Sequence, residues 1–143
     1  MTKSTLKVVG WQEWAIFPEI NYERIKMKVD TGAKTSCLHA FKIEPFTQEG
    51  KPWIKVWLHP QQDSHREVVC NFAVFDRRNV KDSGGHVTQR YVIKTPVVIG
   101  QQQFDIELTL TARDNMQFRM LLGRRALDGR YLVDSSASFL LGK

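Results

Sequence analysis

The sequence predicts an all-β domain, either a closed barrel or a sandwich, with one short helix near its C-terminus. Three observations support this fold class. Apolar and polar residues alternate over several stretches, which is the period-two pattern of strands with one buried face. Short segments rich in glycine, proline and polar residues separate these stretches, so neighbouring strands are expected to form hairpins. Only residues 124–127 have the features of a helix.

Four stretches are predicted as strands. Residues 25–29, 53–58 and 104–110 each alternate between side chains that suit a core and side chains that face outward, so each is expected to bury one face. Residues 68–75 are nearly all apolar, which predicts a strand that is covered on both faces.

Turn residues separate the predicted strands at 48–52, 60–63, 82–85 and 100–103. The helix is expected to begin after Gly123 and to stop at Gly129, because glycine commonly ends a helix. No repeat, linker or low-complexity tract divides the chain. Residues 1–143 are therefore predicted to form a single domain of ordinary size.

Composition and charge narrow the classes of partner. No apolar run approaches the roughly 20 residues that a membrane helix needs, so no membrane contact is expected. No secretory signal is recognisable, which predicts a cytoplasmic location with Cys37 and Cys70 as thiols. The net charge of +6 favours an acidic partner, although a solvated basic surface would carry the same charge. No nucleic-acid motif occurs, so nucleic acid is not an expected partner.

The stretch Asp30-Thr31-Gly32-Ala33 directly follows the first predicted strand. A strand that ends there delivers a carboxylate where side chains leave the core, and Gly32 permits a sharp turn or a close approach by another chain. Alone, this stretch is more typical of an ordinary turn than of a catalytic site. Near the other end of the chain, Leu121-Leu122-Gly123-Arg124 places two aliphatic residues and a glycine before the predicted helix.

The pairing of these two stretches resembles the retropepsins, the single-lobe aspartic proteases. Residues 82–86 fall where that family carries its hairpin flap. More closely, the chain resembles a bacterial family labelled ATP-dependent zinc proteases, which shares the retropepsin-like fold. The stretches that carry this resemblance span nearly the whole chain: 10–14, 28–36, 38–41, 43–46, 82–86 and 119–124.

The resemblance implies a closed β barrel of the retropepsin type and an aspartic peptidase activity. Such hydrolysis needs two carboxylates that share one proton, and one chain of this length supplies only Asp30, so a homodimer is expected. Thr31 would donate a hydrogen bond to the partner loop, and the Gly32 N–H would hydrogen-bond the carboxylate. Residues 6–9 and 139–141 are expected to interleave between the subunits.

The resemblance also predicts the residues that contact a peptide or protein substrate: Ala33, Lys34, Ser83, Gly84, Gly85, His86 and Arg124. Retropepsins usually carry an acidic residue where this chain has Lys34, and Arg124 would bind it. Lys34 would repel Arg124, so either another carboxylate replaces this salt bridge or both cations face the substrate. Two such cations suit acidic side chains. The family is often associated with ATP-grasp glutamate ligases, which suggests oligoglutamate tails or glutamylated proteins as substrates.

The family label names ATP and zinc, but the sequence has no recognisable binding motif for either. The sequence contains no glycine-rich phosphate loop and no pair of histidines one helical turn apart, so no cofactor and no metal is predicted. A zinc-dependent hydrolase remains an alternative, because Cys37 and His39 would share one face of a strand. A second alternative is a non-catalytic β module that binds acidic peptides, in which Asp30 has only a structural role.

Overall fold

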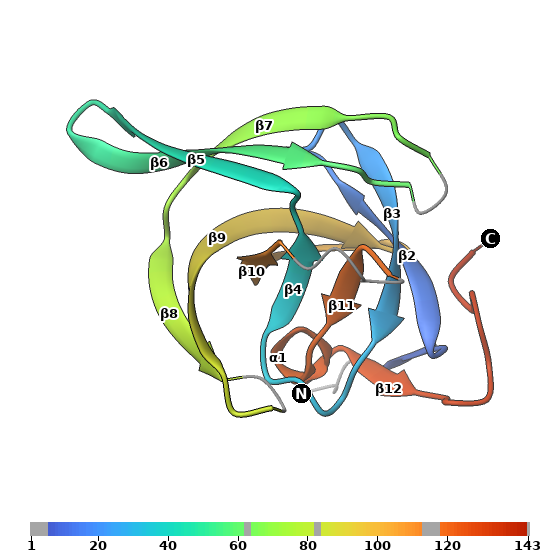
Figure 1. Cartoon of the computed structure of the whole chain (residues 1–143). Helices are drawn as coiled ribbons and strands as arrows, with labels where there is room; N and C mark the ends of the chain where they lie inside the picture. Colours follow the sequence, from blue (N-terminus) through green and yellow to red (C-terminus); the bar gives the residue numbers. More distant parts are fainter. Residues whose placement is uncertain (1–5, 62–63, 82–83, 113–117, 143) are drawn as a thin grey trace, which may run out of the picture.

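The computed structural model of the chain describes residues 6–61, 64–81, 84–112 and 118–142 (Figure 1). Within this part of the chain the secondary structure is almost entirely β. The elements are β1 (Lys7–Val9), β2 (Gln12–Phe17), β3 (Glu23–Val29), β4 (Ser36–His39), β5 (Lys42–Gln48), β6 (Lys51–Leu58), β7 (Val68–Ala73), β8 (Asp76–Lys81), β9 (Val87–Ile99), β10 (Gln102–Thr111), β11 (Met120–Leu122), α1 (Arg124–Leu127) and β12 (Tyr131–Val133).

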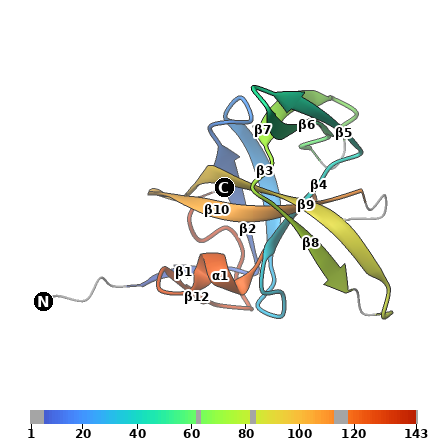
Figure 2. The same cartoon turned by 90° about the vertical axis from the view of Figure 1, so that its left-hand side faces the viewer.

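Six strands close a barrel, which confirms the all-β fold with one short helix. The pairing order is β10, β4, β11, β3, β2 and β9, and β9 pairs back with β10. Strand β8 extends the sheet as a hairpin with β9. In both Figure 1 and Figure 2 the tip of this hairpin lies at the same end of the barrel as the turn between β3 and β4.

One parallel register positions the site. Strands β3 and β11 run parallel, with Val29 opposite Leu122. The residues that follow, Asp30 and Gly123, therefore leave the barrel wall side by side although they are far apart in the sequence. The Asp30 N–H donates a hydrogen bond of 2.9 Å to the Leu122 carbonyl and fixes this neighbourhood.

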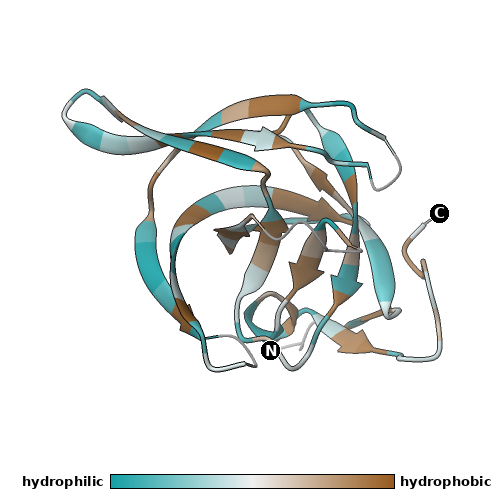
Figure 3. Cartoon of the chain, viewed as in Figure 1, coloured by the Kyte–Doolittle hydropathy of each residue, from teal (hydrophilic) through white to brown (hydrophobic). Residues whose placement is uncertain are grey.

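The predicted strands at residues 25–29, 53–58 and 104–110 lie within β3, β6 and β10 and are confirmed. The prediction for residues 68–75 is wrong in one respect. Strand β7 alternates between buried and exposed residues, with Val69 exposed, because β7 is an edge of the three-stranded sheet β5-β6-β7 and this sheet has a solvent-facing outer side. Figure 3 shows that β11 is uniformly hydrophobic.

The C-terminal segment packs on its own barrel. Glu13, only 1% exposed, accepts hydrogen bonds from the N–H groups of Gly10 (2.7 Å), Leu140 (2.9 Å) and Leu141 (3.3 Å). A buried carboxylate needs such donors, and the C-terminal segment supplies two of them through Leu140 and Leu141. The expectation that residues 139–141 interleave with a second subunit stays a prediction.

The N-terminal strand β1 pairs with another strand of the same chain. Strand β1 pairs in parallel with β12, with Val8 opposite Leu132. In Figure 2 this two-stranded ribbon lies at the same end of the barrel as the β3–β4 turn. Among the described residues, no helix is long and apolar enough to cross a membrane.

Tyr131, in β12, provides a test of the packing at this end of the barrel. Its hydroxyl donates to the Ile99 carbonyl at 3.2 Å, and burial raises its pKa to about 12. The unfolded chain loses this proton near pH 10, so above that pH the unfolded state binds fewer protons than the native state. We expect the free energy of unfolding to fall as the pH rises from about 10 to 12, and to fall less steeply in Tyr131→Phe. Urea denaturation across this range measures both slopes, and equal slopes would contradict the buried hydroxyl.

Candidate active site

The turn that follows β3 holds Asp30 in a defined conformation. The Gly32 N–H donates to Asp30 Oδ1 at 3.0 Å, which is the hydrogen bond that the resemblance to the retropepsins implies. The Ala33 N–H donates to the Asp30 carbonyl at 3.2 Å and closes the turn. Asp30 is partly exposed, and Thr31 and Gly32 are exposed. The carboxylate is thus oriented by the backbone and accessible from outside.

Gly123 and the start of α1 clamp this turn from the opposite side. The Gly123 N–H donates to Ser36 Oγ at 3.0 Å, and the Arg124 N–H donates to the Ala33 carbonyl at 2.7 Å. A β-carbon on Gly123 would lie 2.7 Å from the Thr35 carbonyl carbon. Only glycine lets the two segments approach this closely.

The Arg124 guanidinium turns toward the backbone of the Asp30 turn. Its Nη1 donates to the Thr31 carbonyl at 3.1 Å and to the Gly32 carbonyl at 3.4 Å. These contacts take the place of the salt bridge that an acidic residue at position 34 would provide. Arg124 thereby supports the turn, whereas its predicted contact with substrate stays a prediction.

A cleft of about 950 Å³ opens beside the turn, and Gly32, Ala33 and Lys34 form part of its wall. Strands β3, β4, β8, β9, β10 and β11, the helix and the residues Thr35 and Phe118 supply the rest. Among the described residues that line it, six are cationic and none is acidic: Lys28, Lys34, Arg78, Lys81, Arg90 and Arg125. A concave surface with one sign of charge concentrates ions of the opposite sign, so this cleft attracts anionic groups.

Arg78 differs from the other five cations because acidic neighbours hold it. Its side chain lies 2.6 Å from Glu107 Oε1 and 2.8 Å from Asp76 Oδ2, and hydrogen bonding to these carboxylates raises the pKa of the guanidinium. The other five form no ion pair with any residue of the described ranges. Their charge remains available to a ligand.

The predicted flap corresponds to the β8–β9 hairpin. Its strands contribute Lys81 and Arg90 to the cleft wall. At its tip, Gly84, Gly85 and His86 are exposed and do not line the cleft in this conformation, and Gly85 adopts a positive φ of 85°. Ser83 lies outside the described residues. A substrate contact by the tip stays a prediction.

The cysteine and histidine residues of the zinc alternative lie on or near β4. Cys37 and His39 are both buried in this strand, and Cys37 reaches the cleft wall. Across the described ranges, no three His, Cys, Asp or Glu side chains come together as a metal site. Burial, together with Glu23, raises the pKa of the Cys70 thiol, which keeps it protonated.

Sequence reasoning missed most of the cationic wall. Lys28, Arg78, Lys81, Arg90 and Arg125 come from four separate elements, β3, β8, β9 and α1, and no local spacing connects these elements. The signals that were available are the net charge of +6 and the position of Arg125 directly after the Gly-Arg pair. Of the predicted substrate contacts, Ala33 and Lys34 do line the cleft.

Comparison with known proteins supports one family. A curated relative from Shewanella halifaxensis, named "Probable alpha-L-glutamate ligase", is 47% identical over 137 residues, which cover 95% of this chain and 30% of the relative. A protein of the same name from Desulfotalea psychrophila is 44% identical, and the match covers 96% of this chain and 30% of that protein. The chain thus spans about 30% of the length of these relatives.

Among solved structures, a Legionella pneumophila protein of unknown function superimposes with a TM-score of 0.80 and 25% identity. The match covers 96% of this chain and 99% of the Legionella chain. The model of the RimB-like family, described as "Retropepsin-like aspartic endopeptidase RimB", matches residues 8–143. The chain therefore belongs to the RimB-like family of retropepsin-like aspartic endopeptidases.

Proposed function

We propose that this chain is an aspartic endopeptidase that acts as a homodimer and hydrolyses acidic peptide chains. The observation that carries the proposal is the combination of an oriented Asp30 carboxylate with a cationic cleft that begins at the same turn. Family membership supports the type of chemistry. The charge of the cleft wall supports the type of substrate.

In the proposed reaction the two Asp30 carboxyl groups share one proton. One carboxylate accepts a proton from a water molecule, which attacks the peptide carbonyl carbon. The other carboxyl, which is protonated, donates to the carbonyl oxygen, and the carbon-nitrogen bond breaks as the amine nitrogen takes up a proton. The Gly32 N–H stabilises the carboxylate through Oδ1 and keeps it oriented.

A second copy is needed because each chain contributes one such carboxylate. The β1–β12 ribbon is the surface that we propose to meet its symmetry mate. Val8 and Leu132 lie opposite each other on this ribbon and are 42% and 56% exposed. Two parallel strands with an exposed apolar face are unusual, because parallel sheets are normally covered and a two-stranded ribbon is marginal alone. Pairing with a second copy would cover these side chains close to the Asp30 turn.

An acidic chain suits the cleft because five cations there have no acidic partner within the described ranges. The names of the curated relatives point to the same chemistry, since a glutamate ligase extends a chain that carries carboxylates. We therefore propose oligoglutamate segments or glutamylated proteins as substrates, with the hydrolase shortening what a ligase of that kind builds.

The charge of Lys34 should affect the affinity for acidic substrates. We expect Lys34→Glu to raise KM for a glutamate-rich peptide about tenfold at low ionic strength, because a cation in the cleft wall becomes an anion. The effect should shrink as salt is added. Lys55→Glu is the matched control, because Lys55 is exposed on the outer side of β6 beside Trp57. Equal changes in KM for the two variants would contradict a specific role for the cleft.

The same cleft would also serve a module that binds acidic peptides without cutting them. Asp30→Asn separates the two functions, since it removes the shared proton and leaves the cationic wall in place. The proposal requires that this variant binds an acidic peptide but no longer hydrolyses it.

A further inference from the structure

We propose that the outer face of β3 is a second binding surface, which holds the part of an acidic peptide chain that extends beyond the cleft. This outer face is formed by Arg24, Lys26 and Lys28 and is called the β3 row below. The inference rests on the proposed function for its ligand class, and it adds a selectivity for chain length that the cleft alone would not give.

The β3 row follows from the alternation of the strand. Ile25, Met27 and Val29 are buried in the core, so the residues between them share the opposite, outward face. Successive members of the row are two residues apart, or about 6.6 Å along an extended strand. An extended peptide presents every second side chain on one side with the same repeat. A run of glutamates can thus place successive carboxylates opposite successive cations.

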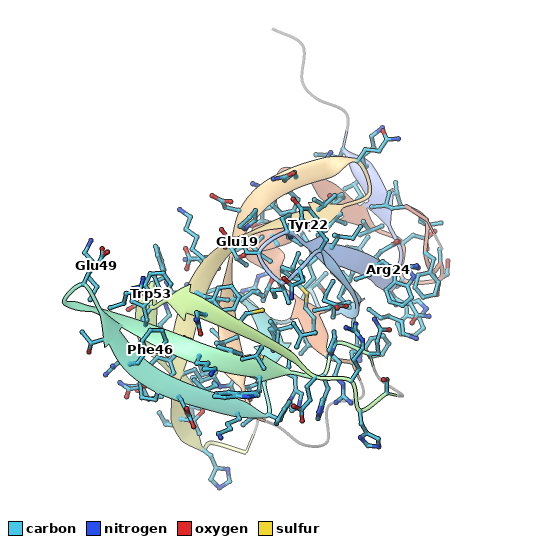
Figure 4. All side chains as sticks on the ribbon, turned by 90° about the horizontal axis from the view of Figure 1, so that it is seen from above. Glu19, Tyr22, Arg24, Phe46, Glu49 and Trp53 are labelled. Carbon is cyan, nitrogen blue, oxygen red and sulfur yellow. The ribbon has the colours of Figure 1, made fainter. Side chains whose placement is uncertain are left out.

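The row is continuous with the cleft. Lys28 belongs to both, because it also lines the cleft wall. Arg24 lies four residues before it, so the row extends about 13 Å along β3 away from the Asp30 turn. In Figure 4 Arg24 is well separated from Phe46 and Trp53, which lie on the β5–β6 hairpin. An acidic peptide that leaves the cleft past Lys28 would contact Lys26 and Arg24 next.

The neighbouring strand contributes no opposing charge to this face. Across from the row, β2 places Gln12 opposite Lys28, Trp14 opposite Lys26 and Ile16 opposite Arg24. The acidic residue nearest in sequence, Glu23, is already paired, because its Oε2 lies 2.6 Å from Arg66 Nη2. The row therefore keeps its positive charge.

Trp14 holds two members of the row in place. The Arg24 guanidinium lies 3.8 Å from the centre of the Trp14 ring, and Lys26 Nζ lies 5.8 Å from it. Phe139 of the C-terminal segment stacks on the same tryptophan with ring centres 5.9 Å apart. Side chains that are already ordered lose less conformational freedom when a ligand binds. The row is thus better prepared for binding than isolated surface lysines.

Simultaneous contact with the cleft and the row should make affinity depend on chain length. A chain of about four glutamates can fill only one of the two surfaces, whereas about twelve residues, extended over about 40 Å, can reach both. The second contact is then intramolecular, and we expect the longer chain to bind at least about tenfold more tightly at low ionic strength.

The test measures binding in Asp30→Asn protein, which cannot consume the ligand in the proposed mechanism. Fluorescently labelled α-linked oligoglutamates of the two lengths are titrated and followed by anisotropy. Adding Arg24→Gln and Lys26→Gln together should remove most of the length preference, because the affinity of the long chain falls much more than that of the short chain, which can still bind in the cleft. Lys42→Gln with Lys55→Gln is the matched control, because it removes two cations from the β5–β6 hairpin; it should leave the preference intact.

The inference is overturned if long and short chains bind equally well, or if the control pair reduces the preference as much as the row pair does. Failure of the proposed function is a separate outcome. If wild-type protein does not cleave the long chain but the preference responds to the row variants, the second binding surface stands and the peptidase proposal falls.

Discussion

Asp30→Asn is expected to reduce hydrolysis of an acidic peptide by at least about a thousandfold, because the substitution removes the carboxyl group that exchanges protons with water and substrate. Binding should persist. The asparagine side chain keeps an oxygen in the position of Asp30 Oδ1, which can still accept the hydrogen bond from the Gly32 N–H. Initial rates and peptide affinity, measured on the same preparation, provide both quantities.

Asp134→Asn is the matched control for this variant. Asp134 directly follows β12, as Asp30 follows β3, but it lies in an exposed turn, where its Oδ1 accepts hydrogen bonds from Ser136 N (3.0 Å) and Oγ (2.6 Å). These contacts lower its pKa and keep it ionised. We expect full activity in Asp134→Asn. An active Asp30→Asn, or an inactive but folded Asp134→Asn, would contradict the assignment.

Gly123→Ala is expected to cost about 3 kcal/mol of unfolding free energy and to reduce activity severely, because its new β-carbon meets backbone atoms that cannot rotate away. That carbon would lie 2.7 Å from the carbonyl carbon of Thr35 and 3.0 Å from the carbonyl oxygen of Ala33. Relief of the collision must move either the Asp30 turn or α1. Urea denaturation and initial rates measure the two effects.

Gly129→Ala separates collision from backbone preference. Gly129 has a φ of +76°, and a β-carbon there would meet nothing within 4 Å beyond its chain neighbours, whereas Gly123 has an ordinary φ of −89°. The alanine at 129 should cost about 1 kcal/mol and leave the rate per folded molecule unchanged. If Gly123→Ala reduced stability and activity no more than Gly129→Ala does, the close contact between Gly123 and the Asp30 turn would not be needed for either.

The barrel strands could be predicted where one face is buried and the other is not. The alternation of apolar and polar residues identified β3, β6 and β10, because one face of each strand is buried in the core and the other faces solvent. It failed for β7, since an apolar composition does not distinguish a strand that is covered on both faces from one whose exposed side happens to carry Val69 and Ala73. Whether the second face of a strand is buried depends on whether another part of the fold covers it, and the local sequence does not contain this information.

The core of the candidate site was predictable for a different reason. Asp30 and Gly123 each lie in a short stretch with a recognisable residue order, so both could be found before their parallel strands brought them together. The cationic wall could not be found in this way. Arg78 and Arg90 line the cleft because the β8–β9 hairpin lies at the same end of the barrel as the Asp30 turn, and Arg125 lines it from α1.

A subunit-mixing experiment tests the shared dyad most directly. Wild-type protein is mixed with increasing amounts of Asp30→Asn protein, subunits are allowed to exchange, and hydrolysis of an acidic peptide is measured at constant total protein. If each site needs Asp30 from both chains, activity falls as the square of the wild-type fraction and reaches about one quarter in an equal mixture. A linear fall to about one half would mean that each chain carries a complete site, which would contradict the account.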